Sequence, residues 1–147
     1  MPEANSLSGL GQESRDKIER MFSGCQEVIG IEHVASVLAG GPSHSGDDQL
    51  VAYIGLEPSG KAHLAYMLLA DTIRNMLEEG VNVIILLADW HAWVNDKFDR
   101  DMAKIALSGE YLTEIFRALL GNPDEGEGPG NLRFLSASDL MDSGKYW

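Results

Sequence analysis

One apolar run, Val81–Ala88 (VNVIILLA), constrains the fold of this chain more than any other feature. Its residues are mostly β-branched or leucine, which is typical of a strand covered on both faces in a parallel sheet. A second strand is predicted at Leu50–Gly55 (LVAYIG) and a helix at Leu64–Glu79, ended by Gly80. Strand, helix and strand in this order predict a βαβ unit.

The segments on either side extend this unit. A helix is predicted at Phe98–Leu120, followed by a strand at Leu132–Leu135 and a short helix capped by Ser136 or Ser138. Together they predict an α/β fold, the first β-α-β-α-β half of a three-layer, Rossmann-like parallel sheet. Two further helices, from Glu13 and across Glu32–Leu38, predict an N-terminal helical lead-in. We expect residues 1–12 to be a mobile terminus and residues 13–147 to form one domain.

Composition narrows the classes of function. Eleven Lys and Arg against 23 Asp and Glu give a net charge of −12, the wrong sign for holding nucleic acid by neutralising phosphates. An RNA partner would need a local basic patch or another part of the protein. The single cysteine, Cys25, cannot form an internal disulfide, and no apolar run reaches the roughly 18 residues of a membrane helix. We expect a cytoplasmic protein without membrane contact.

Ligands of open parallel sheets bind beyond the carboxyl ends of the strands. Two segments should reach that edge, GLEPSGKAHLAY (55–66) and ADWHAWVND (88–96). Gly60 and Lys61, beside a helix N-terminus, are candidates for an anion site, although a surface turn with a helix cap fits the same pattern. Neither the Walker nor the dinucleotide-binding glycine pattern is present.

His91 stands between Trp90 and Trp93 and follows Asp89. Two aromatic walls and an imidazole could line a pocket for a flat ligand, and an aspartate that caps a helix explains the segment equally well. His63 lies on a different element from His91, and no H-x-x-x-H spacing or carboxylate cluster accompanies either of them. No metal site is therefore predicted.

Two motifs taken together, AYIGLEPSGKAHLAY and VIILLADWHAWVND, resemble the catalytic domain of tyrosyl-tRNA synthetases of the archaeal and eukaryotic branch of class I. QEVIGIEHVASVL and NLRFLSASDLMDSGKYW extend the resemblance over nearly the whole chain. It implies a tyrosine–tRNA ligase, which uses ATP with Mg²⁺ to form tyrosyl-adenylate and transfers tyrosine to tRNA(Tyr). Catalysis in such enzymes is mainly positioning and charge stabilisation.

The resemblance also implies residue roles. The sequence His63-Leu64-Ala65-Tyr66 occupies the place of the class I H-I-G-H signature, so His63 and Tyr66 would be catalytic. The implied ATP-binding residues are Gly60, Lys61, His63, Ala65 and Tyr66, and the implied tyrosine-binding residues are Tyr53, Gly55, Glu57, Leu86, Ala88 and His91. We expect Tyr53, His63 and His91 to face one shared cavity.

The family also needs a second half of the nucleotide-binding fold, a K-M-S-K-S loop and an anticodon-binding domain. We therefore expect an N-terminal half that contacts tRNA mainly through regions outside this sequence, with a complementary C-terminal half or a second copy of the chain as candidate partners. The alternative function is a truncated or non-catalytic synthetase-like module for protein interaction or for binding a small aromatic ligand. An unrelated nucleotidyl transferase of similar fold is a third reading.

Overall fold

The computed structural model describes residues 10–41, 49–121 and 129–143. Three strands, β1 (Val51–Leu56), β2 (Asn82–Leu87) and β3 (Leu132–Ser136), form one sheet in the order β1-β2-β3. Both pairs are parallel, with Gly55 opposite Leu86 and Leu86 opposite Leu135. This arrangement confirms the predicted α/β class, and each strand lies within a residue or two of its predicted bounds.

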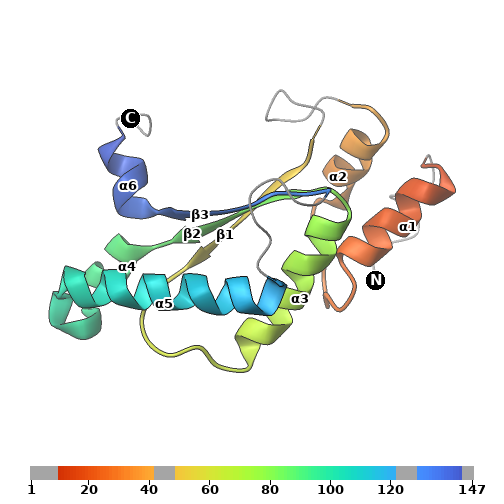
Figure 1. Ribbon diagram of the computed structural model, residues 1–147. Coiled ribbons are helices and arrows are strands. Elements are labelled where there is room, and N and C mark those ends of the chain that lie inside the picture. The colour runs from red at the N-terminus through yellow and green to blue at the C-terminus, as the bar shows by residue number, and fades with distance from the viewer. Residues whose placement is uncertain (1–9, 42–48, 122–128, 144–147) are drawn as a thin grey trace.

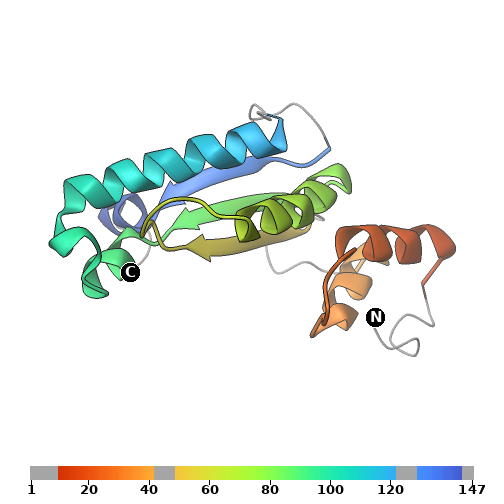
Figure 2. The ribbon, with the colours of Figure 1, turned by 90° about the horizontal axis from the view of Figure 1, so that it is seen from below.

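Two long helices, α3 (Ala65–Glu78) and α5 (Met102–Leu120), lie on the same face of the sheet (Figures 1 and 2). Alternate strand residues point to opposite faces, so one set from each strand packs beneath these helices. Ile85 in the central strand and Phe116 in α5 are completely buried there. The core continues through the following buried residues: Ala70, Ile73, Val81, Val83 and Leu132.

The N-terminal lead-in consists of α1 (Gln12–Met21) and α2 (Ile31–Leu38), whose buried residues Ile18, Met21, Ile31 and Ala35 join the same core. Arg20 of α1 forms an ion pair with Glu79, just after α3. That hydrogen-bonded pairing lowers the pKa of the Glu79 carboxyl from its usual range. Of the predicted mobile terminus, residues 1–9 lie outside the described residues, and Gln12 already belongs to α1.

The helix predicted from Phe98 begins later, at Met102. Phe98, Asp99 and Arg100 have positive φ values of 51°, 55° and 59°, and they form a short 3₁₀ segment, η1 (Lys97–Arg100), that cannot continue into an α-helix. Asp101 then caps α5, because its carboxylate accepts the N–H of Ala103 at 3.0 Å. The spacing of apolar residues did not predict that η1 separates Phe98 from the start of α5.

The other face of the sheet is open over β1. Val51, Tyr53 and Leu135 point to it and are 49%, 76% and 36% exposed. The short helices α4 (Asp89–Val94) and α6 (Ala137–Asp142) lie at the carboxyl ends of β2 and β3 (Figure 1). No helix in the described ranges is long and apolar enough to cross a membrane.

Candidate functional site

A cavity of about 520 Å³ lies at the carboxyl ends of β1 and β2, which is where the sequence predicted a ligand site. Its volume falls within the range of roughly 300–1,000 Å³ that is usual for small-molecule sites. Its walls come from the β1 end, the β2 end, α4 and α6. The lining residues are Gly55, Glu57, Leu86, Ala88, Trp90, His91, Ala137, Leu140 and Met141.

Five of the six residues assigned to tyrosine binding therefore line one cavity. Gly55 and Leu86 are register partners on neighbouring strands, so they share the open face of the sheet. Glu57 and Ala88 immediately follow these strands, and His91 comes from α4. The sixth residue, Tyr53, points to the same face two positions before Gly55, but it is not among the residues that line the cavity.

Glu57 carries the most informative polar atom of this cavity. Its Oε2 accepts a hydrogen bond from Asn95 Nδ2 at 3.4 Å. Its Oε1 is buried and has no partner among the described residues. Burying a carboxylate oxygen without a hydrogen bond is costly, so such atoms need an explanation. A donor group of a bound ligand would provide one after a rotation of the Glu57 side chain exposes Oε1 to the cavity.

The residues assigned to ATP form a separate group. The His63 ring lies 4.8 Å from the Tyr66 ring, and Tyr66 makes an edge contact with buried Phe116 at 5.8 Å. Tyr66 is therefore anchored in the core, whereas Gly60, Lys61 and His63 are exposed in the loop before α3. Of the three side chains expected to share one cavity, only His91 lines the 520 Å³ cavity, and His63 and Tyr53 do not.

Three lining residues, Ala137, Leu140 and Met141, were not assigned to the site from the sequence, whereas Trp90 was one of the two aromatic walls expected there. All three belong to α6, whose position depends on β3 pairing with β2. Of the two predicted caps for α6, Ser136 is the one observed, since its Oγ accepts the N–H of Asp139 at 3.0 Å. The sequence predicted the cap of this helix, but it did not predict that α6 lines the cavity.

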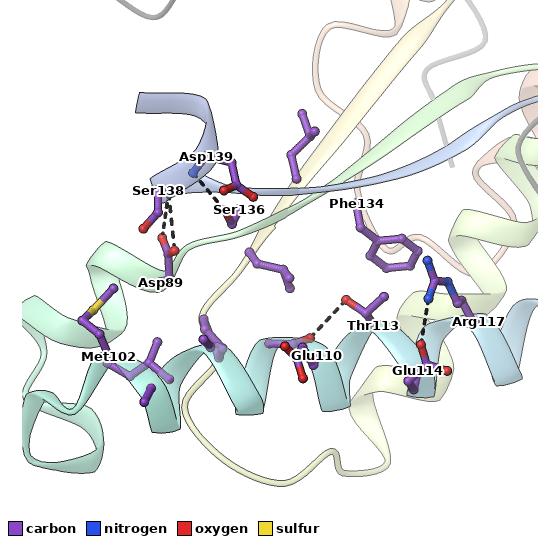
Figure 3. Close-up of a pocket in the computed structure, with 17 residues that line it drawn as sticks. Asp89, Met102, Glu110, Thr113, Glu114, Arg117, Phe134, Ser136, Ser138 and Asp139 are labelled. Carbon is purple, nitrogen blue, oxygen red and sulfur yellow. Dashed lines mark hydrogen bonds and ion pairs between the residues drawn. The ribbon is translucent and has the colours of Figure 1, made fainter. Parts of the chain in front are cut away.

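Asp89 bears on the two interpretations of the segment around His91. It is the first residue of α4 and is only 9% exposed. Its Oδ1 accepts the N–H of Trp90 at 2.8 Å and the N–H of Ser138 in α6 at 3.2 Å. Figure 3 shows this carboxylate directed at the start of α6. Asp89 thus bonds to N–H groups in the first turns of α4 and α6, although the N-cap of α4 is Ala88, and His91 in α4 lines the cavity.

A second cavity, of about 850 Å³, lies between α5, β3 and α6 (Figure 3). Asp89 lines it, together with residues such as Leu87 and Phe134 that point to the helix-covered face. Arg117 at this cavity pairs with Glu114 at 2.7 Å and lies 5.5 Å from the centre of the Phe134 ring. In the described part of the chain, no group of three or more His, Cys, Asp or Glu side chains could hold a metal ion.

Comparison with known proteins identifies the class to which this fold and site belong. The family model described as tRNA synthetases class I (W and Y) matches residues 45–144, and the chain belongs to this family. Tyrosine–tRNA ligases are among the relatives that the chain matches. That of Sulfurisphaera tokodaii is 31% identical over 132 residues, which cover 90% of this chain and 33% of that protein. That of Picrophilus torridus is 34% identical over 133 residues, covering 90% and 36%.

Solved structures give the same result. The tyrosyl-tRNA synthetase of Aeropyrum pernix superposes with a TM-score of 0.73 at 27% identity, over 92% of this chain and 38% of that one. The enzyme of Pyrococcus horikoshii, solved in complex with L-tyrosine, has a TM-score of 0.73 at 26% identity, over 91% and 35%. The chain thus spans about a third of the length of the curated relatives it matches.

Proposed function

We propose that this chain supplies the tyrosine- and ATP-binding half of a tyrosine–tRNA ligase. The observation that carries the proposal is the 520 Å³ cavity, which gathers Gly55, Glu57, Leu86, Ala88 and His91 at the carboxyl edge of the sheet. Similarity to tyrosine–tRNA ligases supports the choice of amino acid.

In this proposal the cavity holds tyrosine. Leu86 and Ala88 offer apolar surface to the ring, and a rotation of the Glu57 side chain brings its buried, unpartnered Oε1 to a donor of the substrate. Tyr53, exposed on the same face, meets the phenolic hydroxyl of the substrate when the rest of the site closes over it. A site that hydrogen-bonds a hydroxyl rejects phenylalanine strongly, because the site's polar group would be left unpaired.

ATP would lie against the loop before α3. The carboxylate of tyrosine attacks the α-phosphorus of ATP, the bond to the β-phosphate breaks, and pyrophosphate leaves with its electron pair. Lys61 and His63 are exposed in the loop before the helix and would stabilise the negative charge that develops on the phosphates. Tyr66, held against Phe116, would keep the nucleotide in place.

We also propose a role for the open face of the sheet. Within the described residues, β1 has a neighbour on one side only, and Val51 and Tyr53 are exposed above it. A free strand edge beside an apolar face is a surface on which a further strand and helix can dock. We propose that a complementary C-terminal half covers this face and completes the site, and that tRNA is bound mainly by that half.

Isothermal titration calorimetry of the 147-residue chain with tyrosine, ATP and a non-hydrolysable tyrosyl-adenylate analogue tests the proposal. Gly55→Leu fills the cavity without backbone conflict, since a Cβ at Gly55 meets nothing within 4 Å. Gly11→Leu, equally unobstructed and in the residue before α1, is the matched control. We expect at least tenfold weaker tyrosine binding for Gly55→Leu only, and equal affinity in all three proteins would refute the assigned cavity.

Tyrosine-dependent pyrophosphate exchange separates the ligase from the alternative, a non-catalytic module. We expect weak exchange by the chain alone, because half of a site gives only part of the transition-state stabilisation. Addition of a complementary C-terminal half should restore it, and His63→Ala should then reduce it. Unchanged exchange after His63→Ala would show that the role assigned to His63 is wrong. If calorimetry detects no binding of tyrosine, ATP or the tyrosyl-adenylate analogue, the protein-interaction module remains as the function.

A further inference from the structure

We infer that Asp89 is a positioning residue that holds α6 against α4 and thereby sets the distance between two walls of the 520 Å³ cavity. Similarity to known proteins assigns no role to Asp89 or to α6. The inference rests on the proposed function only for the identity of the ligand, tyrosine.

The contacts of Asp89 lead to this inference. Its Oδ1 accepts the N–H of Trp90 at 2.8 Å, within the first turn of α4. The same carboxylate accepts the N–H of Ser138 in the first turn of α6, at 3.2 Å to Oδ1 and 3.4 Å to Oδ2. Figure 3 shows the two contacts to Ser138 as they reach across to α6. One buried negative charge therefore lies at the N-terminal ends of two helices, where a carboxylate is favoured.

The two helices carry two of the walls of the cavity. Trp90 and His91 come from α4, whereas Ala137, Leu140 and Met141 come from α6. Each helix has only six residues, too few to hold its position without tertiary contacts. Asp89 itself lines the 850 Å³ cavity rather than the smaller one. It therefore acts on the ligand through the helices and makes no contact of its own.

Asp89→Asn is the informative substitution, because it keeps the shape of the side chain. Asparagine removes the negative charge, and with its oxygen in the place of Oδ1 its NH₂ group takes the place of Oδ2, so that a donor faces the N–H of Ser138. Asp139→Asn is the matched control. Asp139 lies in α6 beside Ser138, is exposed, and carries the same charge, so its substitution reproduces the change in net charge without touching the link.

The first readout is amide hydrogen exchange by NMR, which needs no ligand. In Asp89→Asn we expect the Ser138 amide to exchange at least tenfold faster than in the wild-type chain, since hydrogen bonds to charged groups are among the stronger ones. Asp139→Asn should leave this rate unchanged. An unchanged Ser138 rate in Asp89→Asn would overturn the inference, whatever the ligand proves to be.

The second readout is calorimetric affinity. Asp89→Asn should raise the dissociation constant for tyrosine about tenfold and leave that for ATP within twofold, because α6 does not carry the residues assigned to ATP. Equal weakening for both ligands would indicate a general loss of structure and would overturn the positioning role.

Ser136→Ala loosens α6 from its own cap and should weaken tyrosine binding in the same selective way, so it replaces Asp89→Asn if that variant does not fold. Tyrosine affinity left at the wild-type value by Ser136→Ala would then overturn the inference. If the wild-type chain binds no tyrosine, the proposed function fails, and the exchange rates still decide the role of Asp89.

Discussion

Gly130, two residues before β3, provides the sharpest test of how the third strand is placed. A Cβ on this residue would lie against the carbonyl oxygen of Val81 and 2.8 Å from the carbonyl oxygen of Leu77. Both obstacles are backbone atoms, at the start of β2 and near the end of α3, so no side-chain rotation can relieve the contact. The next residue, Asn131, begins the pairing with β2 by donating its N–H to Asn82 Oδ1 at 3.1 Å.

Gly130→Ala should therefore force a backbone shift where β3 enters the sheet. The φ of Gly130 lies outside the left-handed region, so alanine has no conformational penalty there and the cost is steric. Overpacking of this kind costs about 1–3 kcal/mol. For a chain of this size that corresponds to a fall in Tm of roughly 2–4 °C per kcal/mol. Urea unfolding followed by circular dichroism measures the free energy directly.

Gly109→Ala is the control for this experiment. A Cβ at Gly109 would meet the flexible end of Leu87 at 3.4 Å, and the residue lies inside α5. Replacing an interior helix glycine by alanine gains up to about 1 kcal/mol, so this variant should be as stable as the wild-type chain or more stable. A Gly130→Ala variant with the wild-type urea midpoint would refute the close approach that we describe.

Three further outcomes follow from the fold. Ile85→Ala, at a fully buried position in β2, should cost about 2–5 kcal/mol in urea unfolding. Arg20 lowers the pKa of Glu79, so this ion pair stabilises the fold above the ordinary glutamate pKa of about 4.3. The stabilisation is lost as the pH falls through the lower pKa of the folded state. Glu79→Gln should therefore make the free energy of unfolding depend less on pH in this acid range. The N–H of Lys104 lowers the pKa of Asp101, and Asp101→Ala should speed amide exchange in the first turn of α5 without slowing refolding of the sheet.

The sheet and its covering helices could be predicted because their signals are local. The run at 81–88 leaves few alternatives to a buried parallel strand, and the stripe of α3 has an unambiguous helical period. The start of α5 could not be predicted in this way. Phe98 fits the apolar spacing of the helix, but its left-handed backbone is imposed by the surrounding turn and leaves no mark on a periodicity.

The site residues at the ends of β1 and β2 could be predicted from the sequence, but those contributed by α6 could not. Gly55, Glu57 and His91 come from segments that end at one edge of a parallel sheet, so topology alone brings them together. Leu140 and Met141 reach the same cavity from α6, which follows β3 and contacts α4 through the hydrogen bond between Asp89 and Ser138, residues 49 positions apart. Contacts over that separation depend on packing that no single segment encodes.

The edge of β1, which has no neighbouring strand among residues 10–41, 49–121 and 129–143, has a consequence for the behaviour of the chain in solution. An edge such as that of β1 is a template on which a second copy can add its own strand. At neutral pH the formal charge of −12 makes two copies repel one another. Near the isoelectric point of about 4.5 that repulsion vanishes, so mild acid should convert a well-dispersed chain into one that self-associates along this strand.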